Sequence, residues 1–292
     1  MARKRTVLLY GRTRSGKSTM LGELAEYVKK IEGKNTRIYT CDKGGVDPLQ
    51  PYIDLGIIEV VEQKDTDIWL FLNKAVRGFV RDEKGKWIPG KNENIGIFAF
   101  ESMTAFAESL MASMCKKAGE NISIGGGANV SFSVGGEGEV LKVSGSNMAM
   151  YGICQARMTD EIWESQKLNA SFIVWTASAS KDEDQTAGGK VIGPALIGKA
   201  LTAEIPRWFN LSFRIDALPA QQGKPERHII YLGNSVDLAS GNAVSLGNTR
   251  TPLDSPDLPV SLEPASIVKA LHLIDEAGKG AIEKIKARLA VK

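Results

Sequence analysis

The sequence predicts an α/β fold in which helices cover a mainly parallel sheet. Segments with strand-like and helix-like patterns alternate along most of the chain, which is typical of strands joined by crossover helices. Residues 95–100 form an apolar run, as expected for a strand that is buried on both faces. A glycine-containing loop at residues 11–18 separates the first predicted strand from the first predicted helix. Together these patterns favour one large α/β core.

Short apolar runs bounded by turn residues mark the strands of the first hundred residues. They cover residues 6–10, 37–41, 57–61 and 95–100. Apolar residues at helical spacing run from Met20 to Ile31, and Gly33 is the expected stop. Further helices are predicted at about 67–80 and 104–117, with a polar surface loop or hairpin between them at 81–94.

A glycine-rich insertion follows the helix that ends near residue 117. Eight glycines lie between Gly119 and Gly145, and two alternating runs, 129–134 and 139–143, flank a glycine-rich turn. This pattern predicts a two-stranded β-hairpin at about 119–147, inserted into the α/β core.

The second half of the chain continues the alternation and then changes character. A long helix is predicted at 148–168, and strands at 171–176, 211–215 and 227–232, with a flexible polar stretch at 178–190. Residues 233–264 are rich in Gly, Ser, Asn and Pro and indicate a long connection. Two C-terminal helices, 263–277 and 281–290, are expected to be broken at 278–280. The sequence thus predicts a core at 1–235 and a linker with C-terminal helices at 236–292.

Composition excludes several classes of protein. The chain has 292 residues, of which 43% are hydrophobic and 24% charged, so it is an ordinary globular sequence. No apolar run reaches the roughly 18–20 residues needed to cross a bilayer, so we expect no membrane contact. Three widely spaced cysteines predict reduced thiols and a cytoplasmic setting. A net charge of +3 permits nucleic-acid binding without establishing it.

Residues 11–18, GRTRSGKS, fit the phosphate-binding pattern G-x-x-x-x-G-K-[ST] without deviation. Glycines let the backbone wrap a phosphate chain with its N–H groups pointing inward, and the following helix directs its N-terminal dipole at the anion. Lys17 would neutralise β- and γ-phosphate charge, and Ser18 would supply a hydroxyl ligand to Mg²⁺. The sequence therefore predicts that ATP and Mg²⁺ bind at this loop. Its members are Gly11, Arg12, Thr13, Arg14, Ser15, Gly16, Lys17, Ser18 and Thr19.

A P-loop site also needs an acidic residue at a second strand end. Glu101 ends the apolar strand 95–100 and would hold the magnesium ion or its water, or activate the attacking water. The alternative is that Glu101 caps the next helix near its N-terminus, which is also favourable. Asp42 ends the second strand and is a further candidate for the base, although Asp-Lys-Gly-Gly is also a good turn sequence. Thr176 or Ser178, at the end of the strand predicted at 171–176, would sense the γ-phosphate, although Ser and Thr also occur at strand ends without a function.

Other P-loop classes fit the sequence less well. A GTPase would carry Asn-Lys-x-Asp, and the stretch that begins Asn73-Lys74 lacks the Asp. Asp42-x-x-Gly45 matches the second GTPase motif, but only as a short pattern. A small-molecule kinase would need an arginine-rich lid, whereas Arg12 and Arg14 lie inside the P-loop itself.

The order of parts resembles the RecA-like ATPase core. An acidic strand end at Glu101-Ser102 is followed by a helix and a glycine-rich segment. A helix with Gln155-Ala156-Arg157, a strand ending at Thr176 and a polar stretch closing in Gly188-Gly189 come next. The chain looks most like the compact phage nucleotide-binding proteins of this superfamily, some of which anneal single strands. The resemblance covers about residues 5–235.

The resemblance implies an ATPase that forms a ring or filament and contacts single-stranded DNA through mobile loops. It also implies that a basic residue from the neighbouring subunit completes the site, with Arg250 as the first choice; the other candidates are Arg227, Arg214 and Lys224. The 178–199 stretch has mixed charge, so it is either a solvated loop or an element that orders on polynucleotide or a neighbour. The hairpin is likewise either a DNA contact or a structural or oligomer contact.

The sequence departs from the family in ways that leave two functions open. Glu101 stands where the family usually has Asp, no Asn-Gln pair follows the strand ending at Thr176, and the 233–292 tail has no counterpart. One hypothesis is a Mg²⁺-dependent ATPase acting on single-stranded DNA in recombination or annealing. The other is an ATP-binding oligomeric scaffold or DNA-binding module with little or no hydrolysis.

Overall fold

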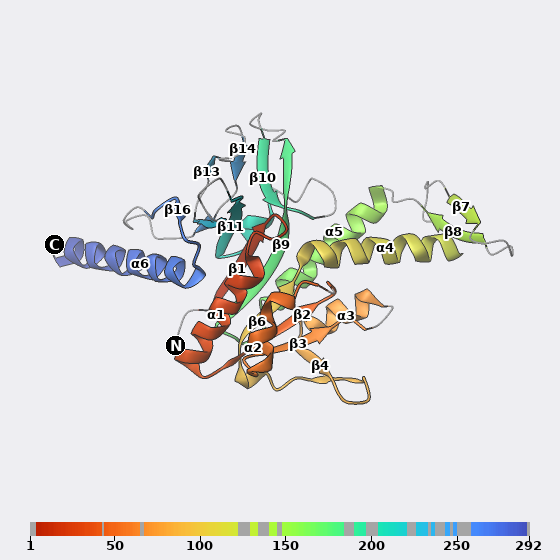
Figure 1. The fold of residues 1–292 in the computed structure, drawn as a ribbon, viewed down its shortest axis with the longest axis horizontal. Helices are drawn as coiled ribbons and strands as arrows, with labels where there is room; N and C mark the ends of the chain where they lie inside the picture. Colours follow the sequence, from red (N-terminus) through yellow and green to blue (C-terminus); the bar gives the residue numbers. More distant parts are fainter. Residues whose placement is uncertain are drawn as a thin grey trace.

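One large sheet forms the centre of the molecule in the computed structural model (Figure 1). The structure describes residues 4–42, 44–64, 67–121, 129–133, 140–144, 148–183, 190–196, 204–220, 226–232, 235–236, 243–245, 248–249 and 258–290. The central strands, in spatial order, are β3 (Ile58–Glu62), β2 (Asn35–Thr40), β6 (Ile95–Glu101), β9 (Phe172–Glu183), β1 (Arg5–Gly11), β11 (Leu211–Leu218), β12 (Arg227–Tyr231) and β16 (Ser261–Leu262).

The sheet is parallel from β3 to β11 and antiparallel beyond it. Smaller strands complete it: β10 (Lys190–Pro194), β14 (Ala243–Ser245) and β13 (Ser235–Val236) extend from the end of β9, and β15 (Asn248–Thr249) pairs with β11. Strand β9 lies between β1 and β6, so the carboxyl ends of these three parallel strands meet at one edge. The predicted fold class, α/β with a mainly parallel sheet, is confirmed.

Helices cover both faces of the sheet because successive residues of each strand point to opposite faces. Leu8 and Tyr10 of β1 join the core under α3 (Ile68–Ala75), α4 (Met103–Asn121) and α5 (Met148–Ser165). Val7 and Leu9 join the opposite core, under α1 (Lys17–Glu32) and α6 (Ile267–Ala290). A 3₁₀ turn, Asp47–Leu49, and the short helix α2 (Gln50–Asp54) lie beside α1 and were not predicted.

The C-terminal helix is fixed to α1 through Glu23. Its carboxylate accepts hydrogen bonds from the Ser266 hydroxyl (2.5 Å) and the Ile267 backbone N–H (2.9 Å) at the start of α6. The predicted break at residues 278–280 is wrong, because α6 is one helix from Ile267 to Ala290. Ala277 and Ala281 are buried on either side of the two glycines, so packing overrides their low helix propensity. The division into a core and a separate tail stays a prediction.

The predicted glycine-rich hairpin is confirmed as β7 (Asn129–Ser133) paired antiparallel with β8 (Val140–Ser144). It lies at the outer end of α4, away from the central sheet (Figure 1). The insertion therefore extends the molecule outward and leaves the order of the central strands unchanged.

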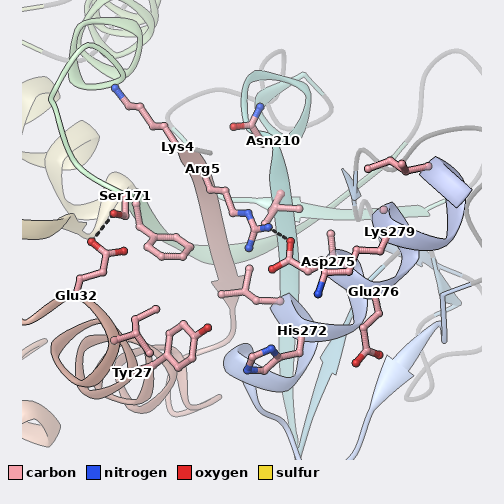
Figure 2. Close-up of a pocket in the computed structure, with 17 residues that line it drawn as sticks. Lys4, Arg5, Tyr27, Glu32, Ser171, Asn210, His272, Asp275, Glu276 and Lys279 are labelled. Atoms are coloured by element: carbon pink, nitrogen blue, oxygen red, sulfur yellow. Dashed lines mark hydrogen bonds and ion pairs between the residues drawn. The ribbon is translucent and has the colours of Figure 1, made fainter. Parts of the chain in front are cut away.

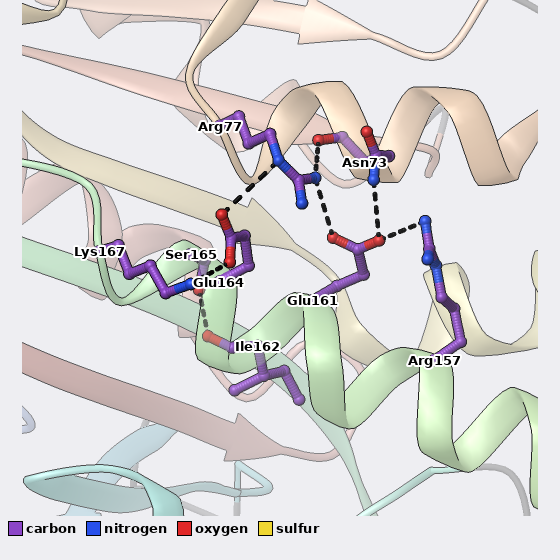
Figure 3. Close-up of polar contacts among 8 residues, drawn as sticks. All are labelled: Asn73, Arg77, Arg157, Glu161, Ile162, Glu164, Ser165 and Lys167. Carbon is purple, nitrogen blue, oxygen red and sulfur yellow. Dashed lines mark hydrogen bonds and ion pairs between the residues drawn. The ribbon is translucent and has the colours of Figure 1, made fainter.

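An ion-pair network fixes α5 against α3 (Figure 3). Glu161 is only 2% exposed; its Oε1 lies 2.5 Å from the Arg157 guanidinium and its Oε2 3.8 Å from that of Arg77. Burial raises the pKa of Glu161, and the two guanidinium groups oppose that shift. Arg157, part of the stretch that suggested the family, therefore belongs to this network in the structure.

Two further segments differ from the sequence predictions. The helix predicted to extend to residue 80 ends at Ala75. Three residues later, Gly78 has a left-handed φ of 74°, and the chain turns into a hairpin of β4 (Phe79–Arg81) and β5 (Trp87–Pro89). Strand β9 continues to Glu183 into the stretch predicted to be flexible, because β10 pairs with it antiparallel. Long-range pairing outweighs local composition in β9.

Candidate functional site

The residues predicted for the nucleotide site come together at the carboxyl ends of β1, β2 and β6. Gly11 is the last residue of β1, Lys17 and Ser18 begin α1, and Glu101 is the last residue of β6. Asp42 follows β2 by two residues. In open α/β sheets, ligands bind at this edge of the strands.

The loop between β1 and α1 has a backbone that only certain residues tolerate. Gly16 has a φ of 97° and Arg14 a φ of 63°, both in the left-handed region. A Cβ atom placed on Gly11 would come within 2.2 Å of the Ile215 carbonyl oxygen on β11. The two motif glycines are thus required, one for φ and one for close approach to the next strand.

The N-terminus of α1 leaves its donors free for an anion. The N-cap residue, Gly16, has no side chain to cap the helix, and the first turn of α1 has no acidic residue. The unsatisfied N–H groups and the positive end of the helix dipole therefore face the loop. This arrangement is typical of phosphate sites.

Lys17 closes over the loop in this structure. Its Nζ donates to the carbonyl oxygens of Gly11 (3.1 Å) and Arg12 (3.0 Å). Burial lowers the pKa of Lys17, while the negative charges of Glu101 and Asp42 oppose that shift. A cation held near the loop and partly removed from water is well placed to meet phosphate oxygens.

Ser18 lies between the loop and the segment after β2. Its hydroxyl donates a hydrogen bond to the Gly45 carbonyl oxygen at 3.1 Å. That bond uses the hydroxyl hydrogen and leaves oxygen lone pairs available to a cation. The sequence singled out Gly45 only in the short pattern Asp42-x-x-Gly45, and its contact with Ser18 was not predictable because a backbone carbonyl acts regardless of residue type.

Glu101 is a buried carboxylate, 4% exposed, and its environment favours the protonated form. Burial raises the pKa of Glu101 to about 7; Thr176 and the charge of Lys17 lower it, and Asp42 raises it. Glu101 Oε2 and Thr176 Oγ1 have no hydrogen-bond partner of ordinary geometry among the described residues. Thr176 therefore acts by proximity more than by a well-formed bond.

Asp42 forms the turn that the sequence suggested, and its role as the base stays a prediction. Its Oδ1 accepts the backbone N–H of Gly44 at 3.2 Å, as in a turn. Its charge also shifts the pKa values of Lys17 and Glu101, so Asp42 lies within electrostatic reach of both. The side chain is half-buried.

The donors at this site fit Mg²⁺ as a partner of a bound triphosphate. In the part of the chain that the structure describes, no three His, Cys, Asp or Glu side chains are grouped to hold a metal. Magnesium sites in nucleotide-binding proteins use one or two carboxylates together with phosphates and water. Ser18 and Glu101 would supply hard oxygen ligands of that kind, and Oε2 of Glu101 is buried with no hydrogen-bond partner among the described residues.

The structure narrows the candidates for a basic residue donated to a neighbour. Arg250 and Lys224 lie outside the described residues. Arg214 is 1% exposed and ion-paired with Asp216, so it cannot reach another subunit, and that candidate is wrong. Arg227 is 43% exposed but pairs with Glu263 at 2.9 Å.

A cavity of about 650 Å³ lies at the opposite edge of the sheet (Figure 2). It is lined by the first residues of β1, β9 and β11 and by α1 and α6, and an ion pair between Arg5 and Asp275 crosses it. The cavity therefore lies away from the carboxyl ends of the strands and takes no part in the nucleotide site.

Comparison with solved structures finds a likeness in fold. No family model matches the chain, and no curated protein matches it in sequence. Among solved structures, the KaiC-like protein PH0186 from the hyperthermophilic archaeon Pyrococcus horikoshii OT3 is similar, with a TM-score of 0.40 and 11% identity over 82% of this chain and 88% of that one. No helix in the described part of the chain is both long and apolar enough to cross a membrane.

Proposed function

We propose that this protein is a RecA-like P-loop ATPase that binds ATP with Mg²⁺ and hydrolyses it. The observation that carries the proposal is the meeting of the uncapped α1 N-terminus, Lys17, Ser18 and Glu101 at one edge of the sheet. Each feature alone has a structural explanation. Their convergence supplies phosphate donors, a cation, a metal ligand and a carboxylate in one place.

We propose a separate role for each group at the site. Loop N–H groups and Lys17 would hold the β- and γ-phosphates, and Ser18 and Glu101 would hold Mg²⁺, which neutralises charge on the phosphates. Glu101 would orient or deprotonate the attacking water. A pKa near 7 suits a general base at neutral pH, because the deprotonated form is available and still accepts a proton readily.

The raised pKa of Glu101 is also compatible with the second hypothesis, an ATP-binding scaffold with little or no hydrolysis. Burial raises the pKa of Glu101 to about 7, so its protonated form competes with its charged form near neutral pH. If a bound ligand does not lower that pKa, the protein would bind ATP and turn it over slowly. Phosphate release measured from pH 6 to 9 distinguishes the ATPase from the scaffold. A slow rate that does not change with pH favours the scaffold.

The partner predictions form the finer part of the proposal. We propose that the active form is a homo-oligomer, with Arg250 reaching the neighbour's site, and that it acts on single-stranded DNA. The outlying β7–β8 hairpin offers a surface away from the nucleotide site for DNA or a neighbour. ATP hydrolysis measured with and without single-stranded DNA tests the DNA role, and no stimulation would contradict it.

Mixing variants tests the shared site. Arg250→Ala subunits keep an intact P-loop, and Lys17→Ala subunits keep an intact Arg250. A mixture should regain part of the hydrolysis that neither variant shows alone. Full activity of Arg250→Ala by itself would contradict the shared site while leaving the P-loop proposal intact.

A further inference from the structure

His228 contacts the phosphate-binding loop from a distant part of the sequence. It lies on β12, and its Nδ1 is 3.0 Å from the carbonyl oxygen of Ser15. The same ring packs against the next residue, because a Cβ placed on Gly16 would be 3.3 Å from Nδ1. One side chain therefore touches two consecutive loop residues.

The chemistry of this contact fixes the direction of the hydrogen bond. A backbone carbonyl oxygen only accepts, so Nδ1 of His228 carries the hydrogen and donates it to Ser15. His228 itself is held by the sheet, since β12 pairs with β11 on one side and with β16 on the other. The His228 carbonyl also accepts the Ala265 N–H at 2.9 Å.

The loop needs such support because of its backbone. Arg14 and Gly16 both have left-handed φ values, 63° and 97°, on either side of Ser15. The Ser15 hydroxyl is buried and has no hydrogen-bond partner among the described residues, so it does not hold the loop. The hydrogen bond from His228 to the Ser15 carbonyl therefore fixes the Ser15–Gly16 peptide unit. The N–H of that unit belongs to Gly16, within the phosphate-binding loop.

We infer that His228 is a positioning residue of the nucleotide site, which holds the Ser15–Gly16 peptide in its phosphate-binding conformation before the ligand arrives. This inference rests on the proposed function. A loop already ordered when the triphosphate binds loses less conformational entropy, so the affinity is higher. His228 touches the loop backbone and acts on the phosphates through it.

The test compares His228→Ala with His228→Asn, whose side-chain amide nitrogen can replace Nδ1 as the donor. His272, the second histidine of the chain, stacks edge-on with Tyr27 at the opposite edge of the sheet, so His272→Ala is the matched control. A fluorescent ATP analogue with Mg²⁺ gives the affinity, and amide hydrogen exchange of residues 15–18 reports loop order without nucleotide.

We expect His228→Ala to weaken nucleotide binding about tenfold, the effect of one lost hydrogen bond. Exchange at residues 15–18 should speed up in that variant, and exchange in the middle of α1 should not change. His228→Asn and His272→Ala should stay within about twofold of the wild type in affinity.

Two outcomes would overturn the inference. One is His228→Ala with wild-type affinity and wild-type exchange at residues 15–18; the other is His228→Asn failing as badly as His228→Ala, which would assign the effect to ring packing. If the wild-type protein binds no nucleotide, the proposed function fails instead. The exchange measurement still decides whether His228 orders the loop, because it needs no ligand.

Discussion

Lys17 and Glu101 stabilise each other's charged forms although they follow strands that are not neighbours. Lys17 comes after β1 and Glu101 ends β6, and β9 lies between these strands. The positive charge lowers the pKa of Glu101, and the carboxylate raises that of Lys17, each against a larger shift caused by burial. A cation and a carboxylate are therefore held close to one edge of the sheet, where a triphosphate and its attacking water would lie.

Replacing Glu101 by Gln separates ATP binding from hydrolysis. Gln keeps the size of the side chain and an oxygen that can bind a metal ion, but it cannot take up a proton at neutral pH. We expect ATP affinity within a few-fold of the wild type and hydrolysis slower by about 10²–10⁴-fold, the usual contribution of a general base. Phosphate release under saturating ATP measures the effect.

The outcome with Asp42→Asn completes that test. If Glu101→Gln retains full activity while Asp42→Asn loses it, the base is Asp42 and Glu101 has a structural role. This pair of variants therefore tests both carboxylates that act on Lys17, the half-buried Asp42 and the buried Glu101.

The raised pKa of Glu101 predicts how the stability of the unliganded protein depends on pH. The folded protein binds a proton at Glu101 up to about pH 7, whereas the unfolded chain releases it near pH 4.5. The folded state thus holds more protons in this window, so the free energy of unfolding falls as pH rises through it. The Glu101 contribution to this fall is at most about 3 kcal/mol, from the difference between the two pKa values.

Denaturant unfolding at pH 5 and pH 8 checks the prediction. Glu101→Gln has no titrating group at this position, so its stability should change less over the same range than that of the wild type. Equal slopes in the two proteins would show that Glu101 does not have a raised pKa.

Gly16→Ala should damage the loop in two ways. The φ of 97° is unfavourable for a residue with a Cβ, and that Cβ would also press on the His228 ring. We expect a loss of nucleotide affinity between about fivefold and about 150-fold, from a strain of about 1–3 kcal/mol. Gly152→Ala is the matched control, because Gly152 lies in α5 with nothing within 4 Å of an added Cβ. Equal affinity in both variants would contradict the loop geometry.

Gly278→Ala tests whether the C-terminal helix is continuous. Gly278 lies inside α6, and an added Cβ would meet no atom within 4 Å. Replacing a glycine in a helix interior should raise the free energy of unfolding by about 0.5–1 kcal/mol. Denaturant unfolding measures it. A loss of stability would instead favour the break at 278–280 that the sequence suggested.

Local patterns in the sequence predicted most of the sheet and the centre of the site. Gly11, Lys17 and Ser18 follow from one contiguous motif, and Glu101 from its place at the end of a buried strand. Contacts between distant segments were not predictable. The Ser15–His228 contact joins residues 213 positions apart, and no spacing rule relates them.

The helix and strand errors have the same cause. Gly278 and Gly280 indicate a break when propensity alone is considered, yet burial of Ala277 and Ala281 keeps α6 continuous. The polar composition after Thr176 suggests a loop, yet β10 supplies a pairing partner that extends β9 to Glu183. Tertiary contacts decided both segments, and a single sequence without a structure does not reveal those contacts.

Equilibrium binding of Mg²⁺-ATP to the wild-type protein and to Lys17→Ala tests the central claim most directly. Lys17 donates hydrogen bonds to two loop carbonyls and would turn to the phosphates when ATP binds. The account predicts saturable binding by the wild type and loss of nearly all affinity in Lys17→Ala, with little change in melting temperature. Unchanged ATP affinity in Lys17→Ala, or no binding by a folded wild-type protein, would contradict a nucleotide site at this loop.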